Sequence, residues 1–227
     1  MWALLPLKDP ARAKKRLAGL LSTAERGALQ AAMAQDVLRV LQHHPDLQGT
    51  LVVCDDPLIC RLASACGAAH ISEATLGAAG LNGAVQAGVA RLAQQGVEEV
   101  LVLHGDLPLV TAEELSQLIH QHRGNQVPAL TLATDRHRQG SNAVLVPTRA
   151  GMTFGYGPAS RRWHEAQAAA RGWPCQVLAL PGLSCDIDDV DDLMTLLDRP
   201  ASGAAPFTRH HLASSGIARR LLTQERA

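Results

Sequence analysis

The fold class of this chain is decided by one stretch, Val100-Leu101-Val102-Leu103-His104-Gly105-Asp106-Leu107-Pro108-Leu109. Its continuous apolar start predicts a strand buried on both faces, as in a parallel sheet. Gly105 breaks the strand and leaves Asp106 at its carboxyl end. Ligands of open α/β sheets bind outside the carboxyl ends of the strands, so a metal ligand at Asp106 would be well placed. A simple turn residue is the alternative interpretation of Asp106.

Short apolar runs of this kind alternate with longer amphipathic ones along the whole chain. The expected strands are 3–7, 50–54, 69–72, 100–104, 128–133, 143–147 and 175–180. The expected helices are 23–43, 57–66, 81–95, 111–122, 159–171 and 190–197. Such alternation predicts an α/β fold, with helices on both faces of a mainly parallel sheet. Because only a polar loop separates 128–133 from 143–147, we expect one locally antiparallel insertion.

Length and composition favour one globular domain. The chain has 227 residues, of which 47% are hydrophobic, enough to bury a substantial core. We place the domain at residues 1–198 and interpret 199–227 as a linker and C-terminal tail. The linker-like part is 199–206, and 208–222 is basic and amphipathic.

Charge and residue content exclude several classes of protein. The formal net charge is zero and only 3% of residues are aromatic, which argues against a nucleic-acid partner. The apolar start is too short for a signal peptide, and no run is long enough for a spanning helix, so we expect no membrane partner. Five cysteines without a CxxC pair favour reduced thiols and a cytoplasmic location. We expect the ten histidines to be solvated surface residues, since they lack metal-site spacing.

A second acidic feature is Asp186-Ile187-Asp188. Residues two apart in an extended segment point to the same side, about 7 Å from each other. Such a pair of carboxylates can share a hard divalent ion, and Mg²⁺ binds proteins through a few carboxylates together with substrate phosphates. With Asp106, these residues would complete a three-carboxylate metal site.

The acids that follow have a simpler interpretation. Asp189, Asp191 and Asp192 surround the start of the helix expected from Val190. Acidic side chains cap a helix amino terminus and offset its positive dipole, so we favour capping for these three. Capping is also the alternative for Asp186 and Asp188.

Phosphate-binding features lie elsewhere in the chain. Residues 8–16 carry five basic side chains directly after the first strand, where cations would neutralise a triphosphate. A solvated basic loop is the alternative. The glycine-containing loops 138–142 and 154–160 present backbone amides, a helix start and the hydroxyls of Ser141 and Ser160, which suit an anion. Asn82, at another helix start, either caps that helix or binds a base edge.

Taken together, six motifs resemble one family, the guanylyltransferases of deazaflavin coenzyme F420 biosynthesis. The motifs are the basic segment 6–17, Gly80-Leu81-Asn82, Gly105-Asp106-Leu107-Pro108, Gly140-Ser141-Asn142-Ala143, residues 154–160 and Asp186-Ile187-Asp188. The resemblance spans about residues 2–197, and the tail beyond Asp198 lies outside it.

The resemblance implies a fold and an activity. The fold would be a single-domain, Rossmann-like mixed sheet, mainly parallel, of the nucleotide-diphospho-sugar transferase type. The activity would be Mg²⁺-dependent transfer of GMP from GTP to 2-phospho-L-lactate, phosphoenolpyruvate or 3-phospho-D-glycerate, with release of pyrophosphate. GTP and a small phosphorylated carboxylic acid would be the partners, and monomer and homodimer both stay open.

The resemblance also implies roles for individual residues. The metal ligands would be Asp106, Asp186 and Asp188. The phosphorylated acid would be held by Ser141, Gly157 and Ser160. The residues facing the GTP phosphates, and acting in catalysis, would be Lys8, Lys14 and Arg16. Asn82 would bind the nucleoside.

Two departures from the family pattern bear on the acid site. The usual Gly-Thr-Asn is Gly-Ser-Asn here, which keeps a hydroxyl. The usual Gly-x-Gly-Ser turn has alanine at position 159, and we expect alanine to exclude a left-handed backbone there. The three acids are not distinguished by these residues. A nucleotidyltransferase for another nucleotide or acceptor, such as a sugar phosphate or molybdopterin, and a non-catalytic GTP-binding regulator remain alternatives.

Overall fold

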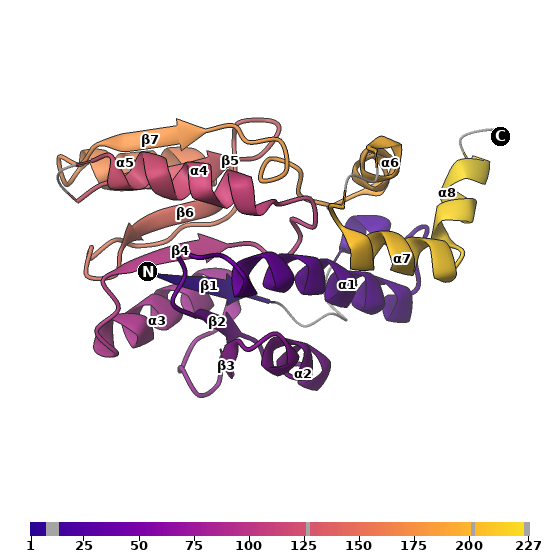
Figure 1. Cartoon of the computed structure of the whole chain (residues 1–227), viewed down its shortest axis with the longest axis horizontal. Coiled ribbons are helices and arrows are strands. Elements are labelled where there is room, and N and C mark those ends of the chain that lie inside the picture. Colours follow the sequence, from indigo (N-terminus) through magenta and orange to yellow (C-terminus); the bar gives the residue numbers. More distant parts are fainter. Residues whose placement is uncertain (8–13, 126–127, 201–202, 225–227) are drawn as a thin grey trace.

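The computed structural model describes residues 1–7, 14–125, 128–200 and 203–224 (Figure 1). Within these ranges the strands are β1 (Trp2–Pro6), β2 (Thr50–Val53), β3 (Ala69–Ile71), β4 (Glu99–Leu103), β5 (Leu130–Thr134), β6 (Ser141–Pro147) and β7 (Cys175–Leu178). The α-helices are α1 (Thr23–Gln42), α2 (Pro57–Ala65), α3 (Gly80–Gln94), α4 (Ala112–Arg123), α5 (Ser160–Ala169), α6 (Val190–Asp198), α7 (Pro206–Ser214) and α8 (Ile217–Gln224). A short 3-10 helix, η2, spans Lys15–Leu17.

The strands form one sheet in the order β3-β2-β1-β4-β6-β5-β7. β1 is parallel to both β2 and β4, and β5 is parallel to β7, whereas β6 runs antiparallel to β4 and β5. The expected α/β class and the antiparallel insertion are therefore confirmed. Leu103 pairs with Ala143, so the amino end of β6 lies beside the carboxyl end of β4.

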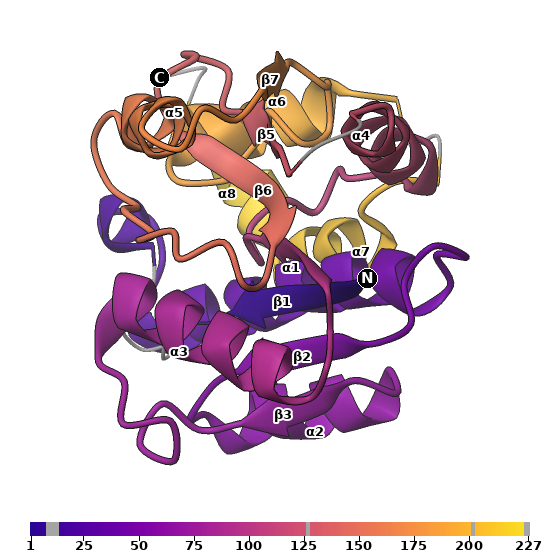
Figure 2. The same ribbon diagram turned by 90° about the vertical axis from the view of Figure 1, so that its left-hand side faces the viewer.

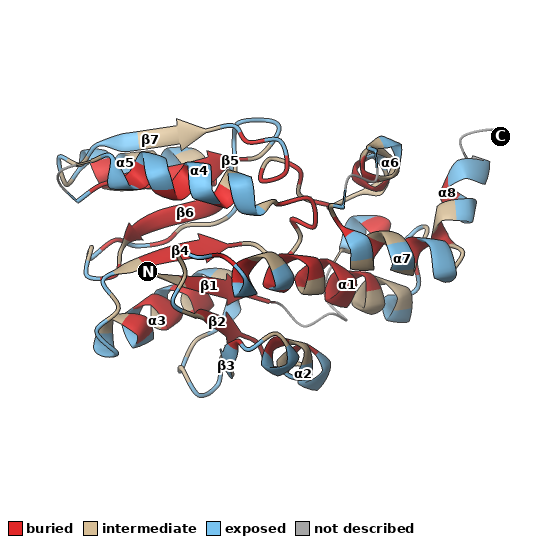
Figure 3. Ribbon diagram, in the orientation of Figure 1, coloured by how far each residue is buried: buried red, intermediate tan, exposed pale blue. Residues whose placement is uncertain are grey.

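Alternate strand residues build two cores, one on each face of the sheet. Leu101 and Leu103 pack with residues of α1, α2 and α4, while Val100 and Val102 pack with residues of α3 and α5. Figure 2 shows these helices on the two sides of the sheet, and Figure 3 shows the central strands buried. This two-sided burial explains why β4 is apolar at every position from Val100 onward.

Residues of the segment interpreted as linker and tail form α7 and α8, and α7 lies along α1 (Figure 1). The Asp36 carboxylate on α1 accepts hydrogen bonds from the backbone amides of Phe207 and Thr208, both at 2.9 Å, and from Thr208 Oγ1 at 2.6 Å. Leu212 and Ile217 join a third apolar cluster that also contains Leu17 of η2. The C-terminal helices thus pack beside η2.

Two expectations about residue type have clear outcomes. All five cysteines are free thiols. The histidines, however, are not all at the surface: His44, His122 and His164 are buried, and each ring has hydrogen-bond partners within the fold. In the described ranges, no helix combines the length and apolar character needed to span a bilayer.

Candidate active site

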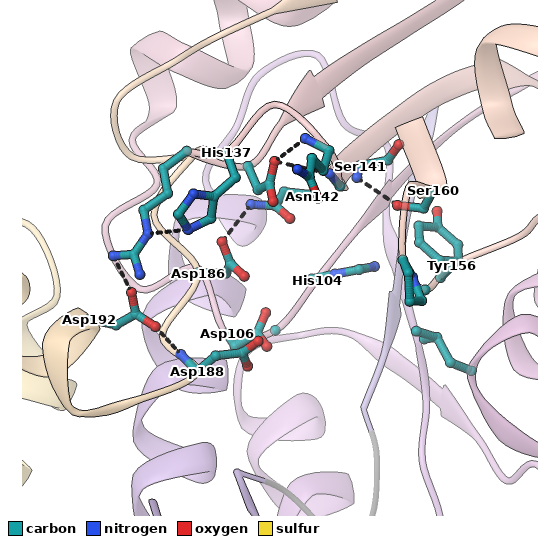
Figure 4. Close-up of a pocket in the computed structure, with 18 of the residues that line it drawn as sticks. His104, Asp106, His137, Ser141, Asn142, Tyr156, Ser160, Asp186, Asp188 and Asp192 are labelled. Atoms are coloured by element: carbon teal, nitrogen blue, oxygen red, sulfur yellow. Dashed lines mark hydrogen bonds and ion pairs between the residues drawn. The ribbon is translucent and has the colours of Figure 1, made fainter. Parts of the chain in front are cut away.

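A cavity of about 630 Å³ opens at the carboxyl edge of β1 and β4 (Figure 4). Because β6 is antiparallel to β4, its amino end also reaches this edge, and the backbone amide of His104 donates to Asn142 O at 3.2 Å. The predicted site residues that line the cavity are Lys14, Arg16, Asp106, Ser141, Gly157, Ser160, Asp186 and Asp188. Segments far apart in the sequence therefore meet at the carboxyl end of β4, where the sequence predicted the site.

One end of the cavity, here called the acidic end, holds Asp106, Asp186 and Asp188 together with Lys14. Lys14 Nζ lies 2.6 Å from Asp106 Oδ2 and 2.8 Å from Asp188 Oδ1, and the lysine side chain is only 4% exposed. The backbone amide of Ile187 donates to Asp106 O at 3.0 Å, which ties the 186–188 segment to the end of β4. A buried ammonium group thus bridges two of the three carboxylates.

Gly105 packs closely against the residue that follows β1. A Cβ atom on Gly105 would lie 2.1 Å from Leu7 Cδ2, so the buried Leu7 side chain would have to shift to admit any side chain at position 105.

The charged groups at the acidic end shift one another's pKa values. Burial raises the pKa of Asp106, but Lys14 and His104 outweigh it, so the pKa lies below its ordinary value. Burial lowers the pKa of Lys14, and the two carboxylates more than compensate. Burial and then the charge of Asp106 raise the pKa of Asp186, although Asn142 Nδ2 donates to this carboxylate at 3.1 Å. Among the described residues of the acidic end, one ammonium group therefore faces three carboxylates, an excess of acidic groups.

The three acids are not arranged as a ready-made metal site. Among the described residues, no group of three or more His, Cys, Asp or Glu side chains is positioned to hold a metal ion. Lys14 lies where it neutralises two of the acids. Asp106 Oδ1 is nevertheless buried without a hydrogen-bond partner in the described part of the chain, so the carboxylate retains a free oxygen for a cation.

Asp189 and Asp192 cap α6, as expected. Asp189 accepts from the Asp192 amide at 3.1 Å, and Asp192 Oδ2 accepts from the Asp189 amide at 3.0 Å, which completes a capping box. Arg136, from the β5–β6 loop, pairs with Asp192 Oδ1 at 2.5 Å. Asp191 is exposed in the first turn of the helix.

The opposite end of the cavity, here called the hydroxyl end, is formed by Ser141 and Ser160, with His164 buried behind them. The Ser141 amide donates to Ser160 Oγ at 2.9 Å, and His164 Nδ1 lies 3.0 Å from Ser141 Oγ. The Ser160 amide donates to Gly157 O at 3.1 Å, which closes the turn into α5.

The expectation for Ala159 is wrong. Ala159 has φ 59° and ψ 30°, the left-handed conformation, at the cap position of α5. The turn therefore keeps the geometry that glycine would favour, at a cost of roughly 1 kcal/mol for the alanine side chain. The contacts of Ser160 with Gly157 and Ser141 hold the turn in place.

Asn82 and Lys8 are not placed in the cavity. The Asn82 amide pairs with the backbone of Tyr156, accepting at 2.7 Å and donating at 3.4 Å, and its neighbour Leu81 lines the cavity instead. Lys8 lies outside the described residues. The roles of Asn82 and Lys8 at the nucleotide stay predictions.

Several residues that line the cavity or lie directly behind its lining were missed by sequence reasoning. His104 and Asn142 each sit at a strand end, inside a motif singled out for a neighbour, and that position was a usable signal. Arg136, Tyr156 and His164 come from loops and a helix face, where one sequence offers no comparable signal.

Comparison with known proteins finds relatives that match most of the chain. The family model described as "Guanylyl transferase CofC like" matches residues 1–219, past the limit of the resemblance at Asp198. The phosphoenolpyruvate guanylyltransferase of Roseiflexus castenholzii is 34% identical over 90% of this chain and 91% of that protein. The 3-phospho-D-glycerate guanylyltransferase of Phenylobacterium zucineum is 33% identical over 87% and 90%.

The fold has a counterpart among solved structures. A protein from Desulfovibrio desulfuricans, assigned as a nucleotide-diphospho-sugar transferase, superposes with a TM-score of 0.69 at 16% identity, covering 98% of this chain and 96% of the other. At this identity the likeness concerns the fold alone, and it confirms the sheet type expected from the sequence.

Proposed function

Because the chain belongs to the guanylyl transferase CofC-like family, we propose that it transfers GMP from GTP to a phosphorylated three-carbon acid. The observation that carries this proposal is the pairing of the two cavity ends. A cluster of carboxylates with a buried lysine faces one side, and two serine hydroxyls, one at the start of β6 and one at the start of α5, face the other. The names of the relatives support phosphoenolpyruvate and 3-phospho-D-glycerate as candidate acceptors.

The reaction would be an in-line displacement at the α-phosphorus of GTP. A phosphate oxygen of the acid forms a bond to that phosphorus, the bond to the bridging oxygen of the β-phosphate breaks, and pyrophosphate leaves with the electron pair. The product is a phosphoanhydride. No protein nucleophile is needed, since the phosphate of the acid is already ionised at neutral pH.

The protein would contribute position and charge. Lys14 and Arg16 would stabilise the negative charge that shifts onto the leaving pyrophosphate. Ser141, Gly157 and Ser160 would orient the acid through hydroxyl and backbone donors at the start of α5. Placing these groups at opposite ends keeps the two anionic substrates apart until their reacting atoms meet.

We also propose Mg²⁺ as the cofactor, held by Asp106, Asp186 and Asp188. Carboxylate oxygens are the ligands that Mg²⁺ prefers, and the unpartnered Asp106 Oδ1 and the excess negative charge fit a cation. The ion would neutralise charge on the triphosphate. Lys14 would then leave the carboxylates and contact the phosphates. A place in coenzyme F420 biosynthesis and a cytoplasmic location, which the five free cysteines support, belong to the same proposal.

The test is pyrophosphate release by the purified protein with GTP, Mg²⁺ and each acid in turn. Asp188→Ala should abolish release and leave the fold intact, because Asp188 is half-exposed at the cavity. Asp191→Ala is the matched control, since Asp191 is exposed and does not line the cavity. Near-normal release by the Asp188 variant would reject the assignment.

The alternatives give different results in the same assay. A nucleotidyltransferase of other specificity would release pyrophosphate with another nucleotide, or with a sugar phosphate or molybdopterin. A regulatory protein would bind GTP without turnover. Crossing the four nucleotides with these acceptors separates the three functions.

A further inference from the structure

We propose that His164 is a positioning residue, which fixes the Ser141 hydroxyl as a hydrogen-bond donor to an anionic group of the acceptor. The inference rests on the proposed function and adds a residue that does not itself line the cavity. His164 lies on α5, is 0% exposed, and contacts through its Nδ1 the hydroxyl of Ser141, which lines the cavity.

The hydrogen-bond partners of the ring assign its tautomer. The backbone amide of Gly155 can only donate, and it donates to His164 Nε2 at 3.4 Å. Nε2 therefore accepts and carries no hydrogen, so the hydrogen of the neutral ring is on Nδ1. Nδ1 in turn donates to Ser141 Oγ, 3.0 Å away. Each ring nitrogen thus has one defined role.

The surroundings of the ring keep it neutral. Burial, followed by the charge of His104, lowers the pKa of His164 to about 4. The rings of Phe154 and Tyr156 pack edge-on against His164, with centroids 6.1 and 5.0 Å away. At neutral pH the ring therefore stays neutral, with its one hydrogen on Nδ1.

The consequence concerns the hydrogens of two hydroxyl groups. Ser141 Oγ already accepts from His164, and Ser160 Oγ already accepts from the Ser141 amide at 2.9 Å. Each hydroxyl keeps its own hydrogen to donate, and the hydrogen bonds of the described residues give neither an acceptor. Both serines line the cavity (Figure 4). The hydroxyl end therefore suits a group that only accepts hydrogen bonds, such as a phosphate or carboxylate.

Two polar substitutions separate this role from a structural one, because they imitate different ring nitrogens. His164→Asn can place its amide near the position of Nδ1 and keep the donor to Ser141. His164→Gln reaches the position of Nε2 and keeps only the acceptor for Gly155. We expect His164→Gln to raise the KM for the acid about tenfold, the effect of one hydrogen bond to a charged group. We expect His164→Asn to stay within threefold of the wild type, and both variants to keep the KM for GTP.

A double-substitution cycle tests whether His164 acts through Ser141. Ser141→Ala should raise the KM for the acid at least tenfold, and His164→Gln added to it should have no further effect. His122→Leu is the matched control, because His122 is also buried and its Nδ1 lies 3.0 Å from a strand hydroxyl, Thr131 Oγ1, away from the cavity. This control should lose stability and keep both KM values.

Three results would overturn the inference: an unchanged KM for the acid in a folded His164→Gln variant, equal effects of Gln and Asn, or effects of Ser141→Ala and His164→Gln that multiply. If the wild type releases no pyrophosphate with any substrate pair, the proposed function fails, and calorimetric binding of 3-phosphoglycerate decides about His164. About tenfold weaker binding by His164→Gln would then support its role. Equal binding, or no binding by the wild type, would reject it.

Discussion

At the acidic end of the cavity, two carboxylates are bridged by the charged side chain of Lys14, whereas at the hydroxyl end neutral groups are held by a backbone amide and a buried ring. Lys14 lies 2.6 and 2.8 Å from two carboxylates that a cation would need. Ser141 Oγ and Ser160 Oγ each accept one hydrogen bond from the protein, and the hydrogen bonds of the described residues include none between the two hydroxyls.

This difference shows that only the hydroxyl end is already arranged to bind its proposed ligand. On the proposed function, a cation bound through Asp106 Oδ2 and Asp188 Oδ1 would displace Lys14 from these two oxygens. The hydroxyl end needs no rearrangement, since its donors already point away from protein acceptors. Binding of the nucleotide and metal should therefore change the structure more than binding of the acid.

The largest effect is expected from Lys14→Met, which removes the group that connects the charges. Turnover should fall about a thousandfold, within the range for loss of one charge-stabilising group. Mg²⁺ alone should also raise the melting temperature of the variant more than that of the wild type, because the carboxylates are then free. Steady-state kinetics and thermal melts with and without Mg²⁺ provide the measurement.

Lys15→Met is the control for this comparison, since Lys15 is exposed and does not line the cavity. It should keep both turnover and the response of the melt to Mg²⁺. A Lys14 variant that keeps a third of the wild-type turnover would show that the acidic end works without its ammonium group.

The next effect concerns pH and the hydroxyl end. The pKa of His164 is lowered to about 4 in the folded protein, from about 6.5 when unfolded. Between these values only the unfolded chain binds the proton, so stability is present above pH 6.5 and is lost as pH falls toward 4. The loss should reach about 3 kcal/mol. Urea titrations at several pH values should show this slope, and His164→Gln should flatten it. An unchanged slope in the variant would mean that other groups cause it.

A smaller effect is expected from Asp36→Ala, which removes the carboxylate that anchors α7 to α1. The free energy of unfolding should fall by about 2 kcal/mol, because three hydrogen bonds are lost while the burial cost of the carboxylate is also relieved. The α7–α8 cluster packs on Leu17, beside Lys14, so the KM for GTP should rise a few fold and the KM for the acid should not. A parallel rise in both values would contradict the separation of the two ends.

The smallest effect is expected from Ala159→Gly. Glycine adopts φ 59° without strain but has more freedom in the unfolded chain, so the net gain in stability should be about 0.5 kcal/mol. Because the left-handed turn is already formed, both KM values should stay within twofold. A marked fall in the KM for the acid would show that the alanine restrains the hydroxyl end after all.

The fold was predictable from the sequence because its signals are local. The apolar run of β4 and the short loop between β5 and β6 each act over a few residues, and both predictions are confirmed. Asp106, Asp186 and Asp188 line one cavity, as predicted, because the sheet topology fixes the edge at which ligands of such folds bind.

The interactions that organise the site could not be read in the same way. Lys14 meets Asp106 and Asp188 across 92 and 174 residues of chain, and nothing in a basic run tells which lysine turns inward. A histidine on an amphipathic helix is equally compatible with surface and core, which is why His164 was assigned wrongly. The amphipathic tail likewise gave no sign that α1 would be its partner.

The two ends also differ in how their residues are distributed along the sequence. The acidic end is assembled from three distant segments, but Ser141, Gly157, Ser160 and His164 all lie between the start of β6 and the middle of α5. One continuous segment, 141–164, can therefore be altered around Asn142 without touching Lys14 or the carboxylates, since Asn142 is the residue of this segment that donates to Asp186 among the hydrogen bonds of the described residues. The choice of acceptor acid is thus free to diverge during evolution, or to be transplanted between relatives named for different acids, while the nucleotide chemistry is inherited unchanged.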